Sequence, residues 1–258
     1  MKKMEQHTRD ELDRALEATV NEVVSDSDIQ ALLKYKKEAE AFQNLMMEYE
    51  CAIREVRTKL EILNKELSLR TERNPFEAIK SRLKSPVSIY EKMKRRNIPF
   101  SVKNIEDNLT DIAGIRVSCS FIDDIYMLRN CLVEQDDIHL IEEKDYIAHP
   151  KTNGYRSLHL ILDVPIFLTG GKKTRIVEVQ FRTIAMDFWA SLEHKLKYKK
   201  DIKDADAIVE ELAYSAEMIN QLDRRMLQIR ERISASDERE MISKALKATE
   251  DGRGGMQE

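Results

Sequence analysis

Residues Thr174–Arg182 read TRIVEVQFR, a run whose side chains change character from one residue to the next. One face of a strand with this sequence would carry Arg175, Val177, Val179 and Phe181. The other face would carry Ile176, Glu178, Gln180 and Arg182. Side chains that alternate with a period of two predict a β-strand, here with three polar groups on one face.

Three more strand-like runs precede this strand, at Ile112–Phe121, Ile138–Ile147 and Leu158–Phe167. Helical patterns lie between or beside the strands, at Ser88–Arg96, Asp123–Gln135 and Ile184–Lys199. Strands interspersed with helices and hairpin-like returns are typical of a mixed sheet. The sequence therefore predicts an α/β (α+β) centre, with a mixed β-sheet and helices on one side of it.

Long helical patterns flank this centre. Apolar side chains recur at intervals of three and four residues over 28–71 and 203–248, and a shorter helix is predicted over 9–24. The spare apolar faces of the two long helices indicate packing on each other or on another subunit, with packing inside one monomer as the alternative. The predicted organisation is N-terminal helices at 1–74, a central domain at 75–200, a C-terminal helix at 201–250 and a disordered tail at 251–258.

The distribution of charge favours a small anionic ligand. The chain has 258 residues and a formal net charge of −4, so it is not built to coat nucleic acid as a whole. Lys80–Arg96 nevertheless carries seven basic residues against one acidic residue, Glu91. This local surplus in an acidic protein indicates a compact anion rather than a long polyanion.

The cysteines and apolar runs indicate a cytoplasmic protein. Three cysteines without a CxxC pair are typical of reduced thiols, namely Cys51, Cys119 and Cys131. The N-terminus has no apolar signal segment. The longest apolar stretch, Leu158–Leu168, is about half of the ~20 residues that span a bilayer. We therefore expect a soluble chain in the cytoplasm and no membrane partner.

Two carboxylates stand at strand positions where they need a partner. Asp111 comes just before the strand predicted at 112–121, and Glu178 lies inside the strand at 174–182. A carboxylate in an alternating strand must face water, pair with a cation or bind a metal, because burial of an unpaired charge is costly. Carboxylates from neighbouring strands suit Mg²⁺, which binds one or two of them plus substrate phosphates. A solvent-facing Glu178 on an open sheet is the alternative.

The basic segment has a spacing that fits a polyphosphate. If a helix starts near Pro86, then Ser88, Lys92 and Arg95 share one face at i, i+4 and i+7. The amides of a helix N-terminus can add to such an anion site. Arg82 could instead stack its planar guanidinium on a base. An ordinary solvated basic face is the alternative. No glycine-rich phosphate loop of the GxxxxGK[ST] or GxGxxG type is present, so ATP, if it is used, would be held by side chains.

The loop at 146–159 gathers polar and aromatic groups around an Asn153-Gly154 turn. After the turn, Tyr155, Ser157 and His159 alternate onto one face of the next strand. A ring that can stack on a base, together with a hydroxyl and an imidazole, is typical of a nucleotide-binding surface. Packing of the tyrosine and histidine within the fold is the alternative.

Taken in order, several motifs resemble the synthetase domain of the RelA/SpoT family. They are RLKS at 82–85, SIYEK at 88–92, DIAGIR at 111–116, KTNGYRSLH at 151–159, EVQFRT at 178–183 and FWASLEHKLKYK at 188–199. The resemblance covers about residues 75–200. It implies a nucleotidyltransferase-like core, and the length with long helices on each side is similar to the stand-alone small alarmone synthetases.

The resemblance also implies roles for individual residues. Arg82 and Arg116 would sandwich the adenine of ATP, and its phosphates would be held by Lys84, Ser88, Lys92 and Arg95. Asp111 and Glu178 would bind Mg²⁺, with Glu178 acting as a metal ligand first and as a general base second. Tyr155 would stack on guanine, and the acceptor nucleotide would be placed by Lys151, Asn153, His159 and Gln180.

The reaction implied is transfer of the β,γ-pyrophosphoryl group of ATP to the 3′-hydroxyl of GDP or GTP, with release of AMP. None of the five histidines is followed by Asp, the pair that the hydrolase half of longer family members uses, so we expect synthesis without hydrolysis. Family members of this size are similar in forming homotetramers through their terminal helices. The alternatives are an inactive nucleotide sensor, a helical scaffold, or a single-stranded RNA binder, which the net charge disfavours.

Overall fold

The computed structural model describes residues 26–71, 73–197 and 205–254, and the chain divides into two compact units. One unit comprises Met1–Glu48 and Pro86–Leu109, and the other comprises Tyr49–Ser85 and Thr110–Glu258. Helix α2 (Asp26–Thr71) contributes residues to both units, and it confirms the helix predicted from apolar periodicity over 28–71. The helix predicted over 9–24 lies outside the described residues.

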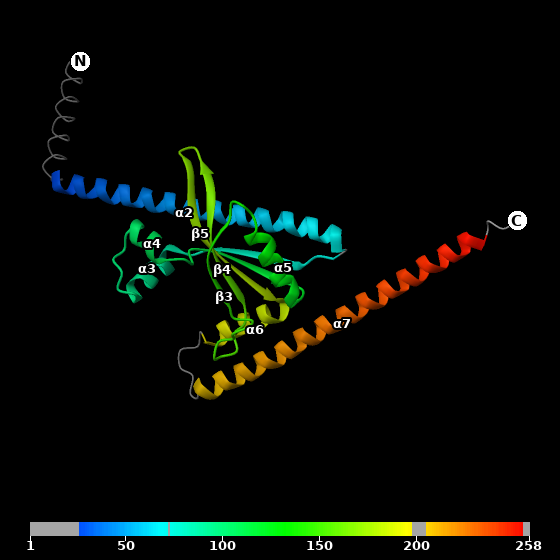
Figure 1. Ribbon diagram of the computed structural model, residues 1–258. Helices are drawn as coiled ribbons and strands as arrows, with labels where there is room; N and C mark the ends of the chain where they lie inside the picture. Colours follow the sequence, from blue (N-terminus) through cyan, green and yellow to red (C-terminus); the bar gives the residue numbers. More distant parts are fainter. Residues whose placement is uncertain (1–25, 72, 198–204, 255–258) are drawn as a thin grey trace, which may run out of the picture. The chain divides into compact units, whose positions relative to one another are not determined.

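The larger unit contains a five-stranded sheet in the order β1-β2-β5-β4-β3. Strands β3, β4 and β5 of this sheet are labelled in Figure 1. Its strands are β1 (Phe76–Leu83), β2 (Ala113–Cys119), β3 (His139–Asp145), β4 (Leu158–Leu168) and β5 (Gly171–Thr183). The β2–β5 pair is parallel and the other neighbouring pairs are antiparallel. The predicted mixed sheet is therefore confirmed, together with all four predicted strands.

Strand β1 is the strand that the sequence pattern does not reveal. It lies at one edge of the sheet, pairs only with β2, and has polar and apolar side chains in equal number, of which only Phe76 is buried. A strand with one neighbour and little apolar burial shows no clean alternation of hydrophobic residues. Its position matters, because it brings the start of the basic segment alongside β2.

The two faces of the sheet differ in character. One face is apolar and buried, with side chains that include Ile115, Val117, Leu160, Val179 and Phe181. Helix α5 (Ile122–Val133) packs on this face, where Arg129 donates to Glu143 of β3 at 2.8 Å. Residues of α2 from Tyr49 onward also pack there, since the Tyr49 ring centroid is 5.9 Å from the guanidinium of Arg175. The opposite face carries the polar groups of β2, β4 and β5.

The prediction of helices on one side of the sheet needs a correction. Strand β5 passes directly into α6 (Ile184–Lys197), and Asp187 in the first turn of α6 pairs with Arg116 and Arg182 of the polar face. The absence of a connecting loop leaves α6 at the strand ends, on the side opposite α5. This arrangement closes one end of the polar face.

Helix α7 (Ala205–Gly254) is fastened to the sheet by polar contacts. The Trp189 indole of α6 donates to the Leu212 carbonyl at 3.0 Å, and the Thr183 hydroxyl donates to Asp223 at 2.6 Å. Further along, Arg230 pairs with Asp123 of α5 at 2.6 Å. The long helix predicted over 203–248 is thus confirmed within the described residues.

The tail predicted as disordered from residue 251 is partly helical, because α7 continues to Gly254. Gly252 lies within this last turn, and one glycine inside a helix costs about 1 kcal/mol relative to alanine, which does not by itself end the helix. Residues 255–258 lie outside the described part of the chain.

The smaller unit contains the first part of α2, α3 (Pro86–Arg95) and α4 (Val102–Asn108). Its α3 agrees with the helix predicted near Pro86. Its α4 was not predicted, since seven residues are too few for a recognisable period, although Ser101 caps it by accepting from the Asn104 amide at 3.1 Å. No helix in the described residues of either unit combines the length and the apolar character needed to cross a membrane.

Candidate active site

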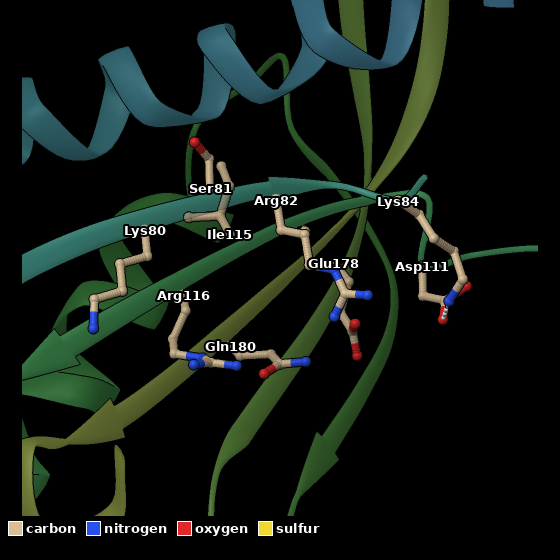
Figure 2. Close-up of a pocket in the computed structure, with 10 residues that line it drawn as sticks. Lys80, Ser81, Arg82, Lys84, Asp111, Ile115, Arg116, Glu178 and Gln180 are labelled. Carbon is tan, nitrogen blue, oxygen red and sulfur yellow. Dashed lines mark hydrogen bonds and ion pairs between the residues drawn. The ribbon is translucent and has the colours of Figure 1, made fainter. Parts of the chain in front are cut away.

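A cavity of about 290 Å³ opens on the polar face where β1, β2 and β5 lie side by side (Figure 2). The register places Arg82 opposite Gly114, Gly114 opposite Glu178, and Arg116 opposite Gln180. The residues that line the cavity are Lys80, Ser81, Arg82, Lys84, Asp111, Gly114, Ile115, Arg116, Glu178 and Gln180. Six residues singled out from the sequence are thereby brought together: Arg82, Lys84, Asp111, Arg116, Glu178 and Gln180.

The two carboxylates of the cavity have different partners. The Lys84 ammonium lies 2.9 Å from Asp111 Oδ2, a contact visible in Figure 2. Oε1 of Glu178 lies 2.9 Å from Nδ1 of His159 on β4. Burial by itself would raise the pKa of Glu178, but the hydrogen bond and charge of His159 and a hydrogen bond from Gln180 outweigh burial, so the pKa is lowered. Glu178 is therefore ionised at neutral pH.

A chain of hydrogen bonds extends from Glu178 across β4 and β5. Nη2 of Arg182 donates to the Tyr155 hydroxyl at 2.8 Å, and that hydroxyl lies 2.8 Å from Nε2 of His159. Because the Tyr155 oxygen accepts from Arg182, its own proton is available to Nε2, and Nδ1–H of His159 can then donate to Glu178. In this assignment of protons, Nδ1–H of His159 orients the carboxylate of Glu178.

The loop after β3 places Lys151 and Asn153 near this chain. The Lys151 ammonium is 4.4 Å from the Tyr146 ring centroid and 4.9 Å from that of Tyr155. Asn153 donates to Glu193 of α6 at 3.0 Å, and its side-chain oxygen accepts from the Tyr155 amide at 3.3 Å. Lys151 packs on two aromatic rings, and Asn153 connects the loop to α6 by hydrogen bonds. Their roles toward an acceptor nucleotide stay predictions.

Three predicted phosphate ligands belong to the smaller unit. Ser88, Lys92 and Arg95 lie on α3 at i, i+4 and i+7, which gives them a common helix face. The helix that this spacing requires is present. Their contact with phosphate stays a prediction.

Two buried residues next to the cavity were not assigned a role from the sequence. Arg182 is 4% exposed and Asp187 is 8% exposed, and Nη1 of Arg182 donates to Oδ1 of Asp187 at 3.1 Å. Alternation along β5 already puts Arg182 on the face of Glu178 and Gln180, which is a usable signal. Asp187 gives no such signal, because its position depends on how α6 follows β5.

Similarity to known proteins agrees with this geometry. A family model described as a region found in RelA/SpoT proteins matches residues 81–203. Over 194 residues the chain is 42% identical to GTP pyrophosphokinase YwaC of Bacillus subtilis, which spans 75% of this chain and 92% of the relative. The chain belongs to the RelA/SpoT family. Within this family it is also 35% identical to GTP pyrophosphokinase YjbM of Bacillus subtilis, over 73% of this chain and 88% of that relative.

Solved structures of the RelA/SpoT family share the fold. Small alarmone synthetase 1 from Bacillus subtilis bound to its product pppGpp superposes with a TM-score of 0.68 at 34% identity, over 74% of this chain and 97% of that one. Small alarmone synthetase 2 from the same organism gives a TM-score of 0.66 at 41% identity, over 74% and 98%. Both likenesses cover about three quarters of this chain and nearly all of the known structure, so the chain has the fold of the small alarmone synthetases.

The turn that presents Tyr155 depends on Gly154, which gives a first testable prediction. Gly154 has a φ of 84°, and a Cβ there would collide with Ala216 of α7. We expect Gly154→Ala to destabilise the fold by about 1–2 kcal/mol from the backbone alone, with an added steric penalty against α7. Thermal unfolding followed by circular dichroism measures this as a lower Tm.

The matched control is Gly170→Ala in the β4–β5 hairpin. A Cβ at Gly170 meets nothing within 4 Å, so the Tm should stay close to that of the natural protein. Equal Tm values for the two alanine variants would contradict the close packing of the turn against α7.

Proposed function

We propose that the protein transfers the β,γ-pyrophosphoryl group of ATP to the 3′-hydroxyl of GDP or GTP, releasing AMP and forming ppGpp or pppGpp. The observation that carries this proposal is a single cavity that holds the carboxylates of Asp111 and Glu178 beside Arg82, Lys84 and Arg116. Support comes from relatives named GTP pyrophosphokinase and from small alarmone synthetase 1, whose structure contains pppGpp.

ATP is proposed to bind along β1 and β2. Arg82 and Arg116 both line the cavity, and a planar guanidinium can stack on each face of a purine. Lys84 stands at the other end of the cavity, next to Asp111, where it can contact phosphate oxygens. Ser88, Lys92 and Arg95 of α3 are proposed to complete the phosphate contacts. Side chains rather than a glycine-rich loop would thus grip the triphosphate.

The acceptor nucleotide is proposed to bind on the β4 side of Glu178. Tyr155 would stack on guanine, and Lys151, Asn153, His159 and Gln180 would hold the ribose and phosphates. The chain from Tyr155 through His159 to Glu178 supports this, because it connects the base-stacking ring to the carboxylate that must meet the 3′-hydroxyl. Reaction requires that hydroxyl in line with the bond between the α- and β-phosphates of ATP.

Glu178 is proposed to take the proton of the 3′-hydroxyl. Its lowered pKa keeps it ionised, Nδ1–H of His159 orients its carboxylate, and its side chain lines the cavity. A general base contributes rate by removing the proton as the new P–O bond forms. The bond between the α- and β-phosphates breaks at the same centre, and AMP leaves with the electron pair.

Asp111 and Glu178 are proposed to hold Mg²⁺. Their carboxylate oxygens are hard donors that line one cavity, and among the described residues no group of three or more His, Cys, Asp and Glu could hold a metal alone. Two carboxylates completed by phosphate oxygens fit the coordination that Mg²⁺ prefers. When bound, the metal neutralises charge on the phosphate oxygens. Before Mg²⁺ binds, the ammonium of Lys84 balances the charge of Asp111.

A direct assay tests the proposed function. Purified protein with Mg²⁺, labelled ATP and either GDP or GTP should release AMP and form a labelled tetra- or pentaphosphate, separated by thin-layer chromatography. Adding excess EDTA should stop product formation. The absence of both products with an intact fold would contradict the proposal, and hydrolysis of added pppGpp would contradict the expected lack of hydrolase activity.

We also propose a homotetramer assembled through the terminal helices, located in the cytoplasm. Helix α7 exposes an apolar stripe at helical spacing, formed by Tyr214, Met218, Leu222, Met226, Ile229 and Ile233. A continuous exposed apolar stripe of this kind is typical of a helix face that packs on another subunit. Light scattering should give a mass of four chains of 30.1 kDa each, and a monomer mass would contradict the assembly.

A further inference from the structure

One buried carboxylate touches the cations of both halves of the site. Asp187, in the first turn of α6, has Oδ1 at 3.1 Å from Nη1 of Arg182 and at 3.4 Å from Nη1 of Arg116. Its Oδ2 lies 3.8 Å from the ammonium of Lys80. Asp187 itself does not line the cavity, so it has no direct part in the proposed chemistry.

Arg182 connects this carboxylate to the acceptor side. Its Nη2 donates to the Tyr155 hydroxyl and to the side-chain oxygen of Gln180, both at 2.8 Å. Its guanidinium also lies 5.2 Å from the centroid of the Tyr155 ring. Arg182 therefore fixes the ring and the amide that are proposed to receive the guanine nucleotide. On the other side of Asp187, Arg116 is proposed to stack on adenine.

We propose that Asp187 is a positioning residue that couples the binding of the two nucleotides, by exchanging its carboxylate between Arg116 and Arg182. The proposal rests on the proposed function. When ATP draws Arg116 onto adenine, Oδ1 of Asp187 is left to Arg182 alone. Arg182 is then held more firmly, and with it Tyr155 and Gln180. Because Tyr155 and Gln180 are then already ordered, the guanine nucleotide loses less free energy in ordering them and binds more tightly.

The electrostatics of the cluster support such an exchange. Burial and the nearby charge of Arg182 lower the pKa of Arg116, while Asp187 opposes that effect. Three cations thus share one buried carboxylate, and movement of any one of them changes how strongly the other two are held. By linkage, the guanine nucleotide must strengthen ATP binding by the same factor.

Calorimetry on the full chain in magnesium buffer tests the coupling. The affinity for GTP is measured with and without a non-hydrolysable ATP analogue, and the ratio of the two Kd values is the coupling factor. We expect the natural protein to show a factor of about five or more, within the usual range for coupled sites. In Asp187→Asn, which keeps the size of the side chain, the factor should fall toward one.

Two variants make the result specific. Asp123→Asn removes a first-turn carboxylate that also pairs with an arginine, Arg230, but touches no residue of the site, so its coupling factor should equal that of the natural protein. Arg182→Lys keeps the charge but cannot reach both Asp187 and Tyr155, so the factor should fall even though Asp187 is intact. This variant decides the matter if Asp187→Asn does not fold.

A coupling factor unchanged in Asp187→Asn, or in Arg182→Lys, overturns the inference, as does a factor of one in the natural protein. Each of these results leaves the proposed function standing, provided that the natural protein forms the labelled tetra- or pentaphosphate. A natural protein that binds both nucleotides but transfers no pyrophosphoryl group would instead overturn the proposed function.

Discussion

Replacing Glu178 by Gln should reduce synthesis of the guanosine polyphosphate by about 100-fold or more, the usual contribution of a general base. Glutamine has nearly the same shape and can still accept from Nδ1 of His159, which now lies 2.9 Å from Oε1 of Glu178. The fold should therefore persist, while a neutral amide can neither accept the proton nor bind a hard cation well. Steady-state rates and a thermal unfolding curve for the same preparation measure both effects.

Glu143→Gln is the matched control. Glu143 is also a strand carboxylate, but it lies on the opposite face of the sheet and pairs with Arg129 of α5. Loss of this partly exposed pair costs about 0–1 kcal/mol of stability, and the rate should not change. Full activity in Glu178→Gln, or an equal loss of activity in the two variants, would remove Glu178 from the proposed mechanism.

Replacing Tyr155 by Ala should weaken binding of the guanine nucleotide by about 5- to 150-fold, because a stacked base is worth about 1–3 kcal/mol. The affinity for ATP should change much less, since Arg82 and Arg116 stay in place. Tyr155→Phe keeps the ring and removes the hydroxyl that connects Arg182 to His159. For that variant we expect a lower kcat with a nearly unchanged Kd for GTP.

The comparison that isolates the hydroxyl is Tyr126→Phe. The Tyr126 hydroxyl donates to Asp145 at 3.0 Å, on the buried face of the sheet, and burial together with this carboxylate raises the pKa of Tyr126 to about 12. Its loss should leave kcat and both nucleotide affinities unchanged. An unaltered Kd for GTP in Tyr155→Ala, measured by calorimetry, would rule out stacking on Tyr155.

Much of the sheet could be predicted because the alternation of side chains along a strand reflects which of its faces is buried. The alternation in Thr174–Arg182 places Glu178 and Gln180 on one face, and the structure has both of them lining one cavity. The motif order then placed Asp111 just before the neighbouring strand and Arg116 on it, and that strand pairs with β5 as a parallel neighbour. Local pattern and sequence order sufficed because Arg116, Glu178 and Gln180 lie on regular strands and Asp111 precedes one by two residues.

What could not be predicted depends on how elements join. β1 shows no hydrophobic alternation, since it is an edge strand of which only Phe76 is buried. The contact between Lys84 and Asp111, and the contact between Tyr155 and His159, depend on how segments that are distant in sequence come together. The pairing of Asp187 with Arg116 depends on the direction in which α6 leaves the sheet. No single-sequence pattern encodes these relations.

Because β5 passes directly into α6 at Ile184, the number of residues between Glu178 on the strand and Trp189 on the helix cannot vary. Most enzymes vary through loops, which absorb insertions and deletions. Here one residue added or removed between Glu178 and Trp189 would either turn the polar side chains of the strand to the opposite face or rotate Trp189 away from α7 by about 100°. This junction can therefore change by substitution but not in length, whereas the β4–β5 hairpin at the other end of the same strand has room to lengthen.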